Sequence, residues 1–181
     1  MSAKKKTPFE WIEKLDVQYS EKRDALTQAI SISTGKNLVT LTVGQLEFAV
    51  EVGLVIETVR YSPPHALPRS FDWVLGVIDL RGEVIPVIDF SAFNGQGQTK
   101  INHQSRMIII KHDDFHYALL VSGVSPVRLV AEDTIFKLKK ENKPKGTKIP
   151  FKEAVLIDNQ QKMYLDINSL SNDKELTQLT F

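Results

Sequence analysis

One stretch decides the fold: Trp73-Val-Leu-Gly76-Val-Ile-Asp-Leu80-Arg81-Gly82-Glu-Val-Ile-Pro86-Val-Ile-Asp89-Phe90. It predicts two apolar strands joined by a tight turn at Arg81-Gly82. Glycine adopts the positive φ that such a turn needs, so Gly82 holds Arg81 at the tip with its guanidinium facing outward. Arginine is the side chain best suited to bidentate recognition of a partner's carboxylate. The segment therefore indicates a docking surface rather than a reaction centre.

On both sides of this hairpin the sequence predicts short strands, bounded by residues that favour turns. The predicted strands are residues 39–43, 46–50, 54–59, 106–111, 115–121, 126–130, 154–157 and 163–167. Pro86 has no N–H to donate, so the second arm of the hairpin should lie at a sheet edge or at a bulge. Roughly nine or ten short strands without helices between them indicate a mainly β domain, either a sandwich or a barrel.

Helices are predicted at the two ends of the chain. Thr7-Pro8-Phe9-Glu10 combines a capping box with proline at the first helical position, and helical spacing of apolar residues continues to about residue 29. The apolar stripe of this helix either packs on the rest of the chain or binds a partner helix. Asn168 is suited to cap a short C-terminal helix. We therefore expect an N-terminal helical extension at residues 1–33 and a folded domain at residues 34–181.

The composition excludes several classes of function. The 181 residues include no cysteine, which excludes disulfides, thiolate metal sites and cysteine nucleophiles. The formal net charge of +1 argues against a dedicated nucleic-acid binder. No apolar run approaches the roughly 20 residues of a membrane-spanning helix, and Thr7 to Glu10 occupies the place of a signal peptide's apolar core. The sequence therefore predicts a cytoplasmic protein.

Two groups of polar residues could carry chemistry, and each has a simpler explanation. His112 and His116 flank the Asp113-Asp114 turn, but zinc needs more strong ligands than these and paired aspartates suit a solvated turn. Asp79 and Asp89 lie on opposite arms of the hairpin, yet no His or Lys completes a catalytic set with them. No catalytic residue, metal or cofactor is therefore predicted. A metal-dependent enzyme using His112 and His116 stays as the alternative.

The stretch from Ala131 to Lys152 holds seven lysines together with two prolines and a glycine. This composition predicts a long solvated loop. A lysine-rich loop could also bind phosphate or nucleic acid, but this one lacks arginine and interleaved stacking aromatics. An acidic partner is the other ligand that such a charge run suits.

Several of these segments together resemble the CheW family of chemotaxis coupling proteins. The family signature is a Gly-Val-Ile-Asn-Leu-Arg-Gly core followed by an apolar strand with a proline and an aspartate, and residues 76–89 match it. Further matches follow in order at residues 46–50, 68–73, 106–110, 117–124 and 163–167. The chain departs from the family pattern at three positions, with Asp79 in place of Asn, Ala118 in place of Gly and Ser122 in place of Asp.

Three features look more like one branch of this family. They are the opening Thr7-Pro8-Phe9, the Trp73-Val-Leu-Gly76-Val start of the hairpin and Phe93-Asn94-Gly95. The chain is similar in these places to PilI, the CheW paralogue in chemosensory systems that govern type IV pili and twitching motility. This similarity implies a pilus-driven output, with flagellar chemotaxis as the alternative.

The resemblance implies a fold and a mode of action. It implies two small five-stranded β-barrels packed around a shared apolar core. It also implies a non-enzymatic adaptor between the cytoplasmic tip of a methyl-accepting chemoreceptor and a CheA-type histidine kinase, recruited to membrane-associated receptor arrays. An apolar groove accepts the side chains of a receptor helix, while an arginine at its rim selects a glutamate. Carried onto this chain, the partner-binding residues are Gly76, Val77, Ile78, Asp79, Leu80, Arg81 and Gly82.

Overall fold

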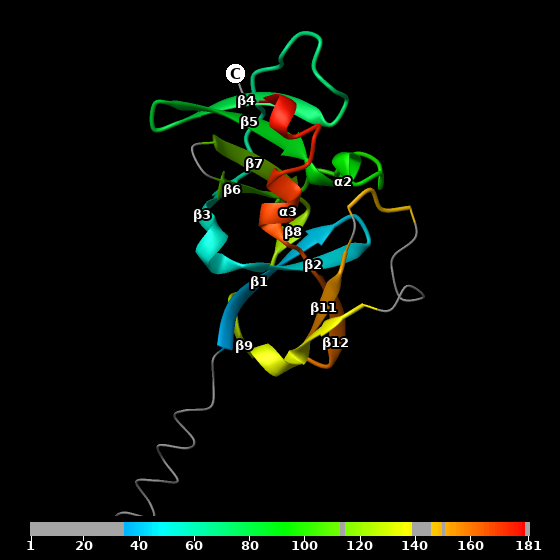
Figure 1. Cartoon of the computed structure of the whole chain (residues 1–181). Helices are drawn as coiled ribbons and strands as arrows, with labels where there is room; N and C mark the ends of the chain where they lie inside the picture. The colour runs from blue at the N-terminus through cyan, green and yellow to red at the C-terminus, as the bar shows by residue number, and fades with distance from the viewer. Residues whose placement is uncertain (1–34, 113–114, 139–145, 150, 180–181) are drawn as a thin grey trace, which may run out of the picture. The chain divides into compact units, whose positions relative to one another are not determined.

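The computed structural model describes residues 35–112, 115–138, 146–149 and 151–179 (Figure 1). The predicted N-terminal helix lies outside these residues. The described part is mainly β, with a seven-stranded and a five-stranded sheet and a few short helices. None of the helices in the described part has the length and apolar character needed to span a membrane.

The five-stranded sheet is continuous in sequence and contains the hairpin. Its order is β3-β6-β7-β5-β4, with β5 and β7 parallel and the other neighbours antiparallel. The hairpin therefore lies at one end of the sheet, with its first arm outermost (Figure 1). The strands are β3 (Val55–Arg60), β4 (Val74–Leu80), β5 (Glu83–Asp89), β6 (Arg106–His112) and β7 (Phe115–Val121).

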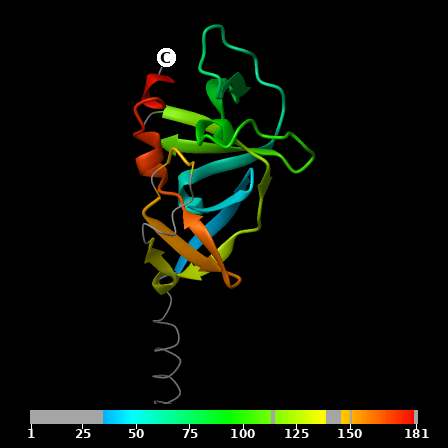
Figure 2. The same ribbon diagram turned by 90° about the vertical axis from the view of Figure 1, so that its right-hand side faces the viewer.

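The seven-stranded sheet combines the first two strands with the last five. Its order is β10-β11-β12-β2-β1-β8, and β9 also pairs with β1. The five-stranded sheet is thus inserted in sequence between two parts of the other sheet (Figure 2). The strands are β1 (Gly35–Val43), β2 (Leu46–Glu51), β8 (Gly123–Val124), β9 (Arg128–Ala131), β10 (Ile135–Lys137), β11 (Glu153–Ile157) and β12 (Gln160–Tyr164).

The described residues include two short α-helices that follow strands, and each begins at a capping aspartate. Asp89 accepts hydrogen bonds from the first backbone N–H groups of α2 (Phe90–Phe93), and Asp166 does the same for α3 (Ile167–Ser171). The predicted C-terminal helix is therefore confirmed, but its predicted cap, Asn168, is wrong because the helix begins before that residue. The remaining helical turns are 3-10 in type: η1 (Val52–Leu54), η2 (Glu132–Thr134) and η4 (Thr177–Leu179).

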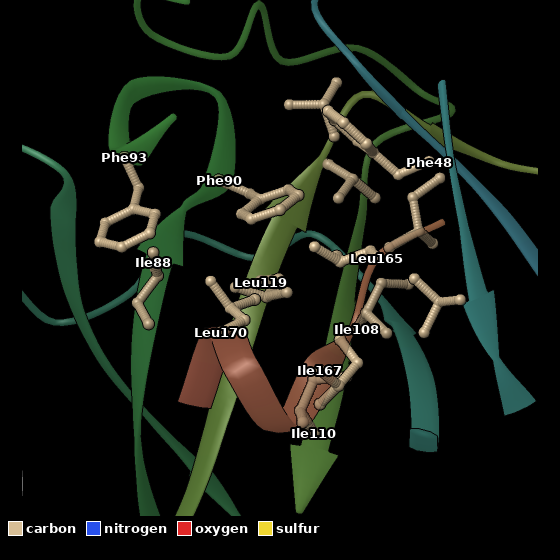
Figure 3. Packing of buried hydrophobic residues seen from close by; sticks show 14 of the residues in the cluster. Phe48, Ile88, Phe90, Phe93, Ile108, Ile110, Leu119, Leu165, Ile167 and Leu170 are labelled. Carbon is tan, nitrogen blue, oxygen red and sulfur yellow. The ribbon is translucent and has the colours of Figure 1, made fainter. Parts of the chain in front are cut away.

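The largest apolar cluster is shared by both sheets and the C-terminal segment. The ring of Phe48 from β2 lies edge-on to Phe90, with centroids 5.6 Å apart, and stacks on Phe151 at 5.0 Å. Ile167 and Leu170 of α3 point into the same cluster (Figure 3). Each sheet also has a smaller cluster of its own. The shared apolar core is thus observed as the family resemblance implied.

The expectation of two five-stranded barrels is met only in part. One of the two sheets has seven strands instead of five, and the strand pairing within the described residues closes neither sheet into a barrel. The nine-residue β1 is long enough to pair with two short strands, β8 and β9, separated by a segment that contains Pro126. A further strand, β10, lies inside the stretch predicted as a solvated loop, because it pairs with β11.

Pro86 is not at a sheet edge, contrary to the prediction, since β5 lies between β4 and β7. Pro86 pairs with Val77, whose N–H and C=O both bond to His65 instead. On the β4 side, Pro86 is therefore in a non-hydrogen-bonded pair, which needs no N–H from Pro86. On the other side, the pairing of β5 with β7 begins one residue later, at Val87. The irregularity in the hairpin lies between Val74 and Gly76.

Asp166 provides a test of how α3 is held. Its Oδ1 accepts hydrogen bonds from the backbone N–H of Asn168 (3.1 Å) and Ser169 (3.3 Å), and its Oδ2 accepts one from Ser169 Oγ (2.5 Å). The hydrogen bond from the Ser169 hydroxyl is the main reason that the pKa of Asp166 lies below its usual 3.8. Asp166→Ala should therefore lower the free energy of unfolding by about 1 kcal/mol at neutral pH.

This stabilisation should depend on pH, with a defined sign. A carboxyl whose pKa is lowered on folding stabilises the protein above its unfolded pKa, and the effect is lost as pH falls through the folded value. Urea unfolding of the wild type and of Asp166→Ala should therefore differ at neutral pH and converge as the pH falls through the lowered pKa of Asp166. A difference of the same size at both pH values would contradict the role of the ionised carboxylate.

Candidate functional site

The turn of the β4–β5 hairpin has two central residues, Arg81 and Gly82, with φ of 57° and 88°. Two positive φ values are the requirement of a type I′ hairpin turn, for which Asn or Asp before Gly is preferred. Glycine adopts positive φ without strain, whereas for a residue with a side chain this backbone conformation costs about 1 kcal/mol. The chain therefore carries arginine at a position where local backbone preference favours a smaller polar residue.

Arg81 contacts β3, the strand at the other end of the same sheet. Its Nη2 lies 2.5 Å from Oε2 of Glu57. The Arg81 side chain is nevertheless 80% exposed, and that of Glu57 is 22% exposed. An exposed ion pair contributes about 0–1 kcal/mol, which is similar to the cost of the backbone conformation. The pair therefore offsets the strain of the turn while it leaves the guanidinium accessible to a partner.

The two faces of β4 have different environments. Ile78 is only 9% exposed and packs in the cluster of the five-stranded sheet, with Leu80 against the same cluster. The alternate residues, Val77 and Asp79, face the other way, where Val77 is half-buried and Asp79 is exposed. Ile78 is therefore a core residue, and only part of the predicted set is available to a partner at the surface.

Asp79, the residue that departs from the family's asparagine, stabilises the turn. Its Oδ1 accepts a hydrogen bond from the Gly82 N–H at 3.3 Å. An asparagine carbonyl could accept the same bond, so the departure preserves this contact. Val84 lies directly across from Asp79 and is 64% exposed. We name four of the exposed and half-exposed residues of this hairpin, Val77, Asp79, Arg81 and Val84, the hairpin patch.

Gly76 fixes the backbone next to the patch. Its φ is 133°, and a Cβ on this residue would lie 2.0 Å from the carbonyl oxygen of His65. The neighbouring Val77 donates its N–H to His65 O (2.9 Å) and accepts from His65 N (2.8 Å). The proline-rich loop that carries His65 therefore runs against the free edge of β4, at a separation that only glycine permits.

Asp79 and Asp89 do not form a pair. Asp79 is at the turn end of the hairpin, whereas Asp89 is at its open end. Asp89 is buried, and its carboxylate accepts bonds from the N–H (2.8 Å) and the hydroxyl (2.6 Å) of Thr99. It also accepts the two N–H bonds at the start of α2. Both carboxylates are thus used in structural hydrogen bonds rather than in an acid–base pair.

Of the two histidines that flank the Asp113-Asp114 turn, only His116 has a described side chain. Its Nδ1 lies 2.5 Å from Oε1 of Glu83, next to the hairpin turn. The side chain of His112 and the intervening aspartates lie outside the described residues. Among the side chains that are described, no three His, Asp or Glu converge as a metal site would require. His116 therefore has a carboxylate partner, and the described residues supply no ligand set around it.

Among the described residues, the titratable groups with shifted pKa values lie away from the hairpin turn: in the seven-stranded sheet, in the core, or, for Asp166, at the start of α3. A hydrogen bond from Lys36 Nζ to Oε2 of Glu51 (3.0 Å) is the main reason that the pKa of Lys36 is raised. Burial raises the pKa of Tyr164, which contacts both of these residues, and that of Tyr117. Ion pairing and burial explain these shifts without a catalytic role.

The lysine-rich stretch is partly ordered by contacts that the sequence does not reveal. Lys137 belongs to β10, and Lys148 Nζ lies 2.6 Å from Oε2 of Glu175. Lys148 Nζ is also 4.0 Å from the ring centroid of Phe93. The prediction of a wholly solvated loop is therefore wrong for these parts of the stretch.

Two residues near the hairpin were not predicted from the sequence. Glu57 carries no sequence signal for its contact with Arg81, because the two residues are on strands that do not pair. Val84 lies in a continuous apolar run, which hides its exposure. Counting outward from the two-residue turn would have placed it opposite the exposed Asp79.

Comparisons with known proteins give a consistent result. A family model described as a CheW-like domain matches residues 37–175. The chemotaxis protein CheW of Bacillus subtilis is 29% identical over 147 residues, which cover 81% of this chain and 93% of that protein. Protein PilI of Pseudomonas aeruginosa is 32% identical over 84 residues, 46% of each chain. The fold is similar to that of the scaffolding protein TtCheW from Thermoanaerobacter tengcongensis, with a TM-score of 0.68, 21% identity and coverage of 78% and 96%.

Proposed function

The chain belongs to the CheW-like domain family, and on this premise we propose that it is a non-enzymatic adaptor in a chemosensory complex. It would hold the cytoplasmic tip of a methyl-accepting receptor and a CheA-type histidine kinase in one geometry. The observation that carries the proposal is the family's Leu-Arg-Gly turn, which here presents an exposed Arg81 at the tip of an edge hairpin. The adaptor would be cytoplasmic and recruited to receptor arrays at the membrane.

The hairpin patch suits a receptor helix in its chemistry. Val77 and Val84 offer apolar surface, and Arg81 offers a guanidinium that can pair with a glutamate on the helix. The core packing behind the patch, through Ile78 and Leu80, makes the hairpin a firm support. In this proposal, a conformational bias of the receptor reaches the kinase because both bind the same adaptor. The effect of receptor binding on kinase affinity must then equal the effect of kinase binding on receptor affinity.

The direct test is a bridging assay with purified components. A tagged receptor cytoplasmic fragment should retain the kinase on a column when the full chain is added, and much less of it without the chain. The kinase should in turn increase the retention of the chain, since coupling of binding is reciprocal. Equal retention of kinase with and without the chain would contradict the adaptor function.

We further propose that the output is type IV pilus twitching. The similarity to PilI and the shared opening and hairpin motifs support this output, whereas the longer match to the Bacillus subtilis CheW supports flagellar chemotaxis as the alternative. Deletion of the gene distinguishes them. The proposal expects smaller twitching zones with normal swimming, and loss of swimming with normal twitching would favour the alternative.

A further inference from the structure

A cavity of about 390 Å³ lies where the two sheets meet. Thr42 of β1 and residues 123–125, in and after β8, line it from the seven-stranded sheet. Gln104 and Arg106, before and at the start of β6, line it from the five-stranded sheet. Its size falls in the range of about 300–1,000 Å³ that binding pockets occupy. None of these residues belongs to the hairpin patch, so the cavity is a separate feature of the molecule.

The charge of the described lining is positive. Arg106 is its one charged residue, and the described lining includes no Asp or Glu. The Nη1 of Arg106 donates hydrogen bonds to the backbone carbonyl oxygens of His103 and Ser105, each at 2.9 Å. These bonds hold the guanidinium by one nitrogen. They leave its charge without a carboxylate partner in the part of the chain that the structure describes.

A second arginine, Arg60, is directly opposite Arg106 in the β3–β6 ladder and is exposed. Opposite residues of an antiparallel pair project from the same face about 5 Å apart, and like charges in these positions repel. Ile108 and Ile110, further along β6, pack in the cluster that both sheets share, so both arginines project on the side of the seven-stranded sheet. The Arg60 side chain has no hydrogen bond or ion pair to the described residues. A bound anion would relieve this repulsion.

The lining also supplies neutral hydrogen-bond donors. The Thr42 hydroxyl and the Gln104 amide line the cavity and make no hydrogen bond to another described residue. Each of them can donate to a ligand oxygen. The Ser125 hydroxyl, in contrast, is already bonded to the backbone of Thr40 (2.9 Å) and of Pro126 (3.2 Å). Two neutral donors are therefore available beside the two arginines.

We propose that this cavity binds a small phosphomonoester, whose phosphate group accepts hydrogen bonds from Arg106 and Arg60. A guanidinium matches two phosphate oxygens at once, which makes arginine well suited to this group. Above its second pKa of about 6, a phosphomonoester carries a charge of about −2, which balances the two arginines. Thr42 and Gln104 would donate to the remaining oxygens. The ligand would contact both sheets, and this role goes beyond the coupling of receptor and kinase.

The test is calorimetric titration of the full chain at pH 8 with phenyl phosphate, compared with phenyl sulfate. The two probes have similar shapes, but the sulfate ester carries a single negative charge and should bind at least about fivefold more weakly. Arg106→Gln should weaken the binding of phenyl phosphate by about tenfold or more, because it removes a charged donor that lines the cavity. Arg60→Gln should weaken it by about threefold, since this arginine is exposed.

Two further variants make the result specific to the cavity. Arg69→Gln removes another exposed arginine that is not part of the lining, and it should change binding less than about twofold. Thr42→Val removes the hydroxyl with little change in shape and should weaken binding by about threefold. It leaves both arginines in place, so it tests the cavity even if Arg106→Gln loosens the backbone at His103 and Ser105.

Four results would overturn the proposal. They are the absence of saturable binding of phenyl phosphate, equal affinity for phenyl sulfate, wild-type affinity in both Arg106→Gln and Thr42→Val, and a loss of affinity in Arg69→Gln as large as that in Arg106→Gln.

Discussion

Arg81→Glu should reduce the association of the chain with a receptor cytoplasmic fragment by about 100-fold, because an attractive charge at the rim of the proposed interface would become a repulsive one. The folded domain should survive the change. The Arg81 side chain is 80% exposed, and an exposed ion pair contributes about 0–1 kcal/mol to stability. Isothermal calorimetry measures the loss of binding, and urea unfolding measures stability in the same preparation.

A milder variant separates the guanidinium from the backbone conformation of the turn. Arg81→Asn creates Asn before Gly82, the pair that a type I′ turn prefers, so the hairpin should be at least as stable as in the wild type. It also removes the charge, and binding should weaken by about tenfold. Arg81→Asn with wild-type affinity would mean that the guanidinium does not contact the receptor.

Gly76→Ala should cost about 4 kcal/mol of folding free energy, the largest change in stability expected at the hairpin. A Cβ would lie 2.0 Å from the carbonyl oxygen of His65 and 2.6 Å from its carbonyl carbon. Both atoms are backbone, so the proline-rich loop or β4 must move. The φ of 133° adds strain of about 1–3 kcal/mol. Because domains of this size are stable by about 5–15 kcal/mol, the variant should be close to unfolding.

Two other glycines serve as controls for this variant. Gly53→Ala meets no heavy atom within 4 Å and has no positive φ, so it should change stability by no more than about 1 kcal/mol. Gly82→Ala also has open space but keeps a φ of 88°, which isolates the conformational strain at about 1 kcal/mol. Urea midpoints should rank Gly76→Ala far below both. Equal midpoints for Gly76→Ala and Gly82→Ala would contradict the close approach to His65.

The hairpin could be predicted from sequence because its determinants are local. Two apolar runs, a Gly82 turn and a two-residue spacing set the register without reference to any distant residue. The cap of α3 shows the limit of this reasoning, since Asp166 and Asn168 are both good caps and only the start of the helix decides between them. Pro86 shows the same limit. Val77, its partner on β4, forms its backbone hydrogen bonds with a distant loop, so this pair needs no N–H from Pro86.

The features that were missed depend on contacts between distant segments. β10 is three residues long, lies among lysines and exists because it pairs with β11. The partner of Arg81 is Glu57, which is 24 residues away in sequence and on a strand that does not pair with the hairpin. Periodicity reports which face of a strand is buried, but it does not report which side chains meet across a sheet. The family resemblance identified the hairpin without revealing this contact.

The contact between Arg81 and Glu57 makes one measurement decisive for the docking role. Arg81→Glu combined with Glu57→Arg restores an ion pair of opposite polarity, while it presents a carboxylate at the exposed tip. Glu57→Gln is the control, since it removes the pair and keeps the guanidinium. Calorimetric titration of a receptor fragment should show near wild-type affinity for Glu57→Gln. It should show binding about 100-fold weaker for the exchanged pair, with unfolding midpoints close to that of the wild type. Recovery of wild-type affinity in the exchanged pair would contradict the account, because Arg81 would then act only through its contact with Glu57.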